Sequence, residues 1–71
     1  MKRHFEFVGG NSAKFWDVAV SGCNVTVCFG RIGTAGQEQT KTLVDAAAAQ
    51  QHADKLTAAK IKKGYLETIP A

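Results

Sequence analysis

Polar and apolar residues alternate along the first half of the chain, which is the period-two pattern of half-buried strands. The pattern predicts three strands, over residues 3–8, 14–20 and 24–29. The first and second are joined by Gly9-Gly10-Asn11-Ser12, and the turn at Ser21-Gly22 joins the second to the third. Such residues are typical of tight turns. Short turns between period-two segments favour an antiparallel meander.

The alternation also predicts which side chains form the core. One face of each strand carries apolar or aromatic residues: Phe5, Phe7, Trp16, Val18, Val20, Val25, Val27 and Phe29. We expect Trp16 and the valines to lie beneath a helix. Phe15, Asp17 and Ala19 are predicted to point to the opposite face.

The second half of the chain has the features of one helix. Asp45 is a good N-cap, because its carboxylate can accept a hydrogen bond from a backbone N–H of the first turn. The predicted apolar stripe consists of Ala49, Ala53, Leu56 and Ala59, with Lys63 at its end. Lys60, Lys62 and Lys63 fall in the last turn, where they complement the negative end of the helix dipole. Gly64 can then adopt the left-handed conformation that ends a helix.

The segments that flank this helix complete the predicted sheet. Residues 37–43 are polar and threonine-rich, so we expect a weaker strand at or near an edge. Residues 65–69 form either a short final strand or an extended tail, which Pro70 ends. The predicted fold class is α+β: a single domain over residues 1–71, with an antiparallel sheet of about four to five strands and one α-helix packed on one face.

Chain length limits what such a domain can do. A chain of 71 residues buries roughly 60% of the surface that its unfolded form exposes, which allows one thin core. A deep catalytic pocket would consume much of that core, so we expect no enzymatic activity, no cofactor and no small-molecule substrate. The sequence has no apolar run long enough for a membrane span and no signal peptide, and we expect a cytoplasmic location.

Two cysteines and two histidines are the candidate metal ligands. Cys23 and Cys28 are predicted to be free thiols, because residues five apart in a strand lie roughly 16 Å apart and a disulfide needs Cα atoms within about 7 Å. Their spacing from His4 and His52 fits no compact zinc pattern. We expect no metal site.

Three glycines mark the segment between the third and fourth predicted strands. Gly30, Gly33 and Gly36 recur every third residue. This spacing differs from the dinucleotide fingerprint G-x-G-x-x-G and from a Walker A loop, and it precedes a strand, not a helix. Two interpretations stay open. The loop is a long hairpin connection whose glycines satisfy turn geometry, or its backbone N–H groups cradle an anion.

Basic and aromatic residues near this loop are the candidate ligand contacts. Arg31 carries a planar guanidinium that suits phosphate, or else it caps loop carbonyl groups. Phe29 shares the parity of the core valines, so it is either a core residue or, if the chain bends at Gly30, an aromatic side chain at the end of the sheet. The lysines are either a basic face for phosphates or solvated charges: Lys41, Lys60, Lys62 and Lys63. The net charge of +3 permits an anionic partner without requiring one.

The run from Val27 to Gln37 resembles the signature of the WGR domain, a family named for its Trp-Gly-Arg tripeptide. The similarity covers nearly the whole chain and includes Lys14-Phe15-Trp16, Lys41, Ala53-Asp54-Lys55-Leu56 and Lys60-Ile61-Lys62-Lys63-Gly64-Tyr65. One position departs from the pattern. Phe29 stands where the tripeptide has Trp, which keeps a stacking face but loses area and the indole N–H.

The resemblance implies both a fold and a function. WGR domains have an antiparallel sheet with one helix and occur in eukaryotic poly(ADP-ribose) polymerases and in bacterial proteins. In the polymerases the domain binds DNA near a strand break. There, the aromatic residue of the tripeptide packs against the terminal nucleotide, and its Arg bonds to nucleic acid or to a neighbouring domain. Carried over, these roles fall on Phe29 and Arg31, and no ADP-ribosyl transfer is implied.

We therefore expect a module that binds nucleic acid, at DNA ends or single-stranded regions. The candidate contacts are Phe29, Gly30, Arg31, Lys41, Lys60 and Lys63. The alternative is a protein-interaction module or a homodimer with no nucleic-acid role.

Overall fold

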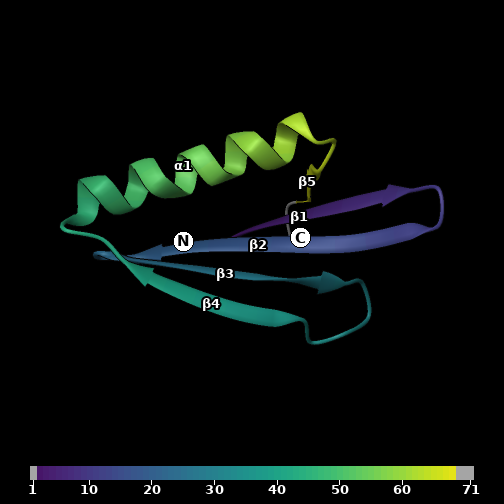
Figure 1. Ribbon diagram of the computed structural model, residues 1–71, viewed down its shortest axis with the longest axis horizontal. Coiled ribbons are helices and arrows are strands. Elements are labelled where there is room, and N and C mark those ends of the chain that lie inside the picture. The colour runs from purple at the N-terminus through teal and green to yellow at the C-terminus, as the bar shows by residue number, and fades with distance from the viewer. Residues whose placement is uncertain (1, 69–71) are drawn as a thin grey trace.

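The computed structural model describes residues 2–68. In chain order the elements are β1 (Lys2–Gly9), β2 (Ser12–Ser21), β3 (Asn24–Arg31), β4 (Gln37–Thr42), α1 (Ala46–Lys62) and β5 (Leu66–Thr68). The five strands form one antiparallel sheet in the order β4-β3-β2-β1-β5. Helix α1 lies across one face of it (Figure 1). The predicted α+β class is confirmed.

Both sheet edges agree with the sequence pattern. Every residue of β4 is exposed, as expected of a polar edge strand, although this strand ends at Thr42 and not at residue 43. At the other edge the segment after the helix forms the short strand β5, where Arg3 donates two hydrogen bonds of 2.8 Å to the Glu67 carboxylate. Ile69 and Pro70 lie outside the described residues.

Two tight hairpins set the register of the first three strands. Gly9 pairs with Ser12, and Ser21 pairs with Asn24, so that each turn contains two residues. The first residue of each turn is a glycine at positive φ, +57° at Gly10 and +58° at Gly22. Glycine at this position is the requirement of the II′ hairpin turn, whose twist matches that of the paired strands.

The core lies between the sheet and α1. Trp16 is paired with Phe5 on one side and with Phe29 on the other, which makes a row of three aromatic residues across the sheet. Phe5 is fully buried and Trp16 is 3% exposed. Ala49 and Ala53 of the helix are buried in the same core cluster as Phe5 and Trp16. Their small side chains let the helix backbone lie close to the strands.

The buried face of α1 differs in part from the predicted stripe. Ala49 and Ala53 are buried as expected, but the third buried position is Thr57, and Ala59 is exposed. The buried positions therefore advance by four residues at each step, and Leu56 packs against the core while only partly buried. The predictions for Ala59 and Lys63 were wrong, because both are exposed. The Thr57 hydroxyl tolerates burial because it donates to the Ala53 carbonyl at 2.8 Å.

Both ends of α1 agree with the sequence. Asp45 is the N-cap, and its side chain accepts a hydrogen bond of 2.7 Å from the Ala48 N–H. Gly64 follows the C-terminal end with a φ of +102°. This conformation lets the chain turn back toward the sheet, where the Tyr65 ring packs on Phe7 with 5.4 Å between the ring centroids.

The face of the sheet away from the helix also holds two buried residues. Phe15 is 9% exposed and Asp17 is 8% exposed. Asp17 lies beside Lys2, at 3.7 Å, and its other carboxylate oxygen accepts a hydrogen bond from His4 Nδ1. The His4 ring also stacks on Phe15, with 6.1 Å between the ring centroids. These contacts shield Phe15 and Asp17 from solvent on the face that the helix does not cover.

We expect stability to depend on the charge of His4. The pKa of His4 is raised, chiefly because its Nε2 lies 3.0 Å from the Glu6 carboxylate and also because of Asp17, although burial opposes the shift. A raised folded-state pKa adds stability that is complete below the unfolded value of about 6.5 and is lost as pH rises through the folded value. The free energy of unfolding should thus fall by about 1 kcal/mol as the pH rises above the folded-state pKa of His4.

Urea denaturation at a series of pH values, from below about 6.5 upward, measures this fall in the free energy of unfolding. His4→Gln should remove the pH dependence, whereas His52→Gln should leave it in place. An unchanged pH dependence in the His4→Gln variant would contradict the assignment.

Candidate nucleic-acid interface

The tripeptide Phe29-Gly30-Arg31 forms the end of β3, and strand alternation divides it between the two faces of the sheet. Phe29 pairs with Trp16 and Arg31 pairs with Lys14, so both lie on the face that carries the helix. Gly30 pairs with Phe15 on the opposite face. The three residues therefore do not form one contact surface.

Gly30 is required by the path of the loop that follows it. A Cβ atom at Gly30 would lie 2.8 Å from the Gly36 Cα, and one at Gly36 would lie 2.4 Å from the Phe29 carbonyl oxygen. Gly36 also has a φ of +72°. The loop thus folds back on the strand that precedes it and covers Phe15. This packing favours the interpretation of the glycines as requirements of a hairpin connection.

The hydrogen bonds of the loop involve the backbone carbonyl of Arg31 and not its side chain. The Arg31 carbonyl accepts from both the backbone N–H of Thr34, at 3.1 Å, and its hydroxyl, at 2.8 Å. Within residues 2–68 the Arg31 guanidinium makes no hydrogen bond to a loop carbonyl, and the residue is exposed. Of the two interpretations of Arg31, this geometry favours the one in which its guanidinium is available to a ligand.

Phe29 is neither fully buried nor free of the core. It is half-buried and packs against the core cluster while also lining an open groove beside the helix. Its ring is therefore held by the core but is reachable from the groove.

Lysines from α1 lie near the same end of the sheet. In Figure 1 the C-terminal end of α1 points to the end where the β1–β2 turn and the β3–β4 loop lie. Lys60 Nζ sits 5.8 Å from the Trp16 ring centroid and 5.2 Å from that of Tyr65. The pKa of Lys60 is lowered, first by burial and then by the charges of Lys63 and Lys14. We call Lys14, Arg31, Lys60 and Lys63 the basic end.

Lys14 is the member of the basic end that sequence reasoning missed as a contact. The two-residue turn at Gly22-Cys23 pairs Ser21 with Asn24, and counting back along both strands from this pair places Lys14 opposite Arg31. The turn was predicted one residue earlier, at Ser21-Gly22, so the sequence prediction did not give the register that pairs Lys14 with Arg31.

The six acidic side chains are distributed over both faces of the sheet, the helix and its N-cap. Three of the six are on the face of the sheet away from the helix: Glu6, Asp17 and Glu38. The others are the N-cap Asp45, Asp54, which accepts a hydrogen bond from Gln50, and Glu67, which pairs with Arg3. The positive charge of the basic end is thus not neutralised by an ion pair within residues 2–68.

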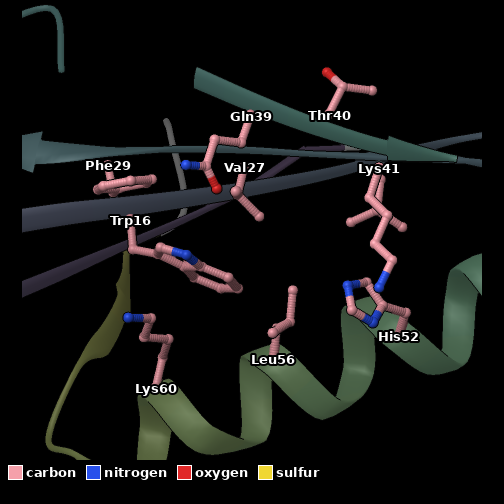
Figure 2. Close-up of a pocket in the computed structure, with 10 residues that line it drawn as sticks. Trp16, Val27, Phe29, Gln39, Thr40, Lys41, His52, Leu56 and Lys60 are labelled. Carbon is pink, nitrogen blue, oxygen red and sulfur yellow. The ribbon is translucent and has the colours of Figure 1, made fainter. Parts of the chain in front are cut away.

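A groove of about 390 Å³ runs between α1 and strands β3 and β4. Its lining includes Trp16, Val25, Val27, Phe29, Gln39, Lys41, His52, Leu56 and Lys60. Figure 2 shows Lys60 beside Trp16 at one end and Lys41 extending toward His52 at the other. Lys41 is therefore separated from the basic end by the length of this groove, and the predicted contact residues do not all come together.

The described residues form no disulfide, no metal-binding cluster and no membrane-spanning helix. Both cysteines are free, as predicted. Within residues 2–68 no three His, Cys, Asp or Glu side chains come together in a way that could hold a metal ion. The helix of this part of the chain is not long and apolar enough to cross a membrane.

The sheet, its single helix and the basic end describe a small α+β domain with one cationic end. Residues 1–70 match the WGR domain, and the chain belongs to that family. The expectation drawn from the tripeptide and the Lys-Gly-Tyr ending is thereby confirmed.

Two proteins of Escherichia coli K12 are similar to the chain. YehF is 45% identical over 65 residues, which is 92% of this chain and 24% of YehF. YfeS is 39% identical over 67 residues, which is 94% of this chain and 28% of YfeS. The chain thus spans about a quarter of the length of these relatives.

A solved structure supports the fold directly. The crystal structure of a protein from Bacteroides fragilis superposes with a TM-score of 0.95 at 48% sequence identity. The match covers 97% of this chain and 20% of the Bacteroides protein. The domain therefore occurs within longer chains.

Proposed function

We propose that this domain is a non-catalytic module that binds nucleic acid through the basic end and Phe29. The observation that carries the proposal is the position of Arg31 and Phe29 on one face, beside basic residues that make no ion pair with an acidic side chain within residues 2–68. Phosphates suit this arrangement because guanidinium and ammonium groups neutralise the backbone. An aromatic ring next to them offers a base or sugar a surface to pack on.

The family supplies an independent reason for the proposal. WGR domains of the poly(ADP-ribose) polymerases bind DNA near strand breaks, and the chain matches this family over residues 1–70. Phe29 has less stacking area than the Trp of the family pattern, so we expect weaker stacking and a greater share of the affinity from charge.

Salt dependence tests the electrostatic share of binding. If the four cations of the basic end neutralise about four phosphates, log affinity should fall with log salt at a slope of about −3.6 for duplex DNA and about −2.8 for single strands. Arg31→Ala should weaken binding by roughly 1–3 kcal/mol and reduce the steepness by about one. Fluorescence anisotropy with labelled blunt, nicked and single-stranded oligonucleotides measures both quantities.

Lys55→Ala is the matched control, because it removes one positive charge from an exposed position of α1 outside the basic end. It should change the affinity much less than Arg31→Ala. If the wild-type protein binds none of these oligonucleotides in a salt-sensitive manner, the proposal is wrong.

A protein-interaction role is the second candidate, and one feature favours it. Strand β4 is exposed along its whole length, and its outer edge offers unpaired backbone groups for strand addition. Light scattering separates the two functions. A stable dimer that ignores all oligonucleotides would favour the protein-interaction role.

A further inference from the structure

The groove between α1 and strands β3 and β4 is largely apolar, and its charged groups are all of one sign. Its floor and walls are apolar or aromatic: Trp16, Val25, Val27, Phe29 and Leu56. Its charged groups are only cations, Lys41 at one end and Lys60 at the other. A carboxylate is absent from the described lining. Such a site suits a flat apolar body with negative charge on both sides of it.

The dimensions of the groove limit its occupant. Lys41 pairs with Val25, four residues along β3 from Phe29, which is about 13 Å of strand. His52 and Lys60 are eight residues apart on α1, which is about 12 Å of helix. The volume of about 390 Å³ lies near the lower end of the roughly 300–1,000 Å³ that small-ligand sites occupy. A single nucleobase with its neighbouring phosphates fits these limits.

Side-chain directions support the same occupant. Figure 2 shows Gln39 and Lys41 pointing from β4 toward the groove, whereas Thr40 points away from it. Gln39 lies near Phe29 and Val27, and its amide can both donate and accept hydrogen bonds. The groove therefore combines an aromatic wall, an amide able to contact a base edge, and two ammonium groups.

We propose that this groove seats an unpaired nucleobase of a single strand, with the flanking phosphates at Lys41 and Lys60. The inference rests on the proposed function and makes it more specific. In a duplex the bases are paired and stacked, so only an unpaired base can lay its face on such a floor. A free mononucleotide carries phosphate on one side only, whereas a strand supplies negative charge to both ends of the groove.

An abasic strand provides the sharpest test. A short oligo(dT) and an abasic strand with the same number of phosphates should differ in affinity by about tenfold, because base stacking is lost while charge is kept. Trp16 is the only tryptophan of the chain and lies in the groove. Its fluorescence should be quenched by oligo(dT) and left nearly unchanged by the abasic strand.

Two variants of β4 locate the effect. Gln39→Phe fills the groove, and phenylalanine is well suited to a strand, so the fold should persist. It should lower oligo(dT) affinity to the level of the abasic strand, without changing abasic binding. Thr42→Phe places the same ring on the same strand but on the opposite face, because Thr42 is three residues away from Gln39 in alternating order. It should leave the difference between the two strands intact.

The outcomes distinguish this inference from the function on which it rests. If no nucleic acid binds, both are overturned. If binding is salt-sensitive and requires Arg31, yet the abasic strand binds equally well, the proposed function stands and the groove assignment is wrong. A mononucleotide that binds as tightly as oligo(dT) and quenches Trp16 as strongly would also overturn the assignment to a single strand.

Discussion

Replacing Gly36 by alanine should destabilise the protein by about 2–5 kcal/mol. A φ of +72° at this position costs an L-residue about 1–2 kcal/mol. In addition, the new Cβ would lie 2.4 Å from the Phe29 carbonyl oxygen and 2.6 Å from Phe15 Cζ. Relieving such overpacking typically costs a further 1–3 kcal/mol or so. Thermal unfolding monitored by circular dichroism measures the sum.

Gly10→Ala separates the two contributions. Gly10 also has a positive φ, +57°, but a Cβ there would meet no atom within 4 Å. This variant should therefore lose only the backbone part, about 1–2 kcal/mol. Equal losses in the two variants would show that the loop does not pack against β3 as described. Because the loop follows Arg31 directly, Gly36→Ala should also weaken oligonucleotide binding, whereas Gly10→Ala should not.

Truncating Phe5 to alanine should have a still larger effect on stability. Phe5 is the largest side chain that is fully buried, and its ring lies 5.6 Å from that of Trp16 between centroids. Removing a buried phenylalanine costs about 3–5 kcal/mol. A domain of 71 residues has a total stability of only about 4–11 kcal/mol, at roughly 0.05–0.15 kcal/mol per residue. The variant should thus lose a large part of its stability.

The fluorescence of Trp16 reports this loss, since unfolding exposes the indole to water. The melting temperature should fall by at least about 12 °C, because each kcal/mol shifts it by about 4–8 °C in a domain of this size. Phe7→Ala is the control on the same strand and face. Phe7 is only half-buried, so its truncation should cost less. If the two variants melt at the same temperature, the core does not centre on Phe5 and Trp16.

The sequence predicted the sheet and its core well, for a local reason. The side-chain direction in a strand alternates with every residue, so the facing of Trp16 and Phe29 follows from the pattern alone. The two-residue turns then fix the register. In the same way, Asp45 and Gly64 mark the helix ends through chemistry that involves only neighbouring residues.

Features that depend on segments far apart in the chain were not predictable from such patterns. Phe15 and Asp17 were expected on the face away from the helix, but their burial depends on the return path of the loop and on His4. The groove exists because α1 packs on β2 and β3 and leaves β4 uncovered. The distance between Lys41 and Lys60 follows from that placement, which no local pattern specifies.

The alternation of Phe29, Gly30 and Arg31 across the sheet has a consequence for how this domain can diversify. Gly30 is restricted by the backbone of Gly36, so that position admits almost no change. Its two neighbours point to the other side of the sheet, where solvent and the groove leave room for different side chains. Under the proposed function, substitutions at Phe29 and Arg31 alter ligand preference while the loop keeps its path. Under the proposed function, Phe29 in place of the family's Trp changes the contact with the ligand and leaves the path of the loop unchanged.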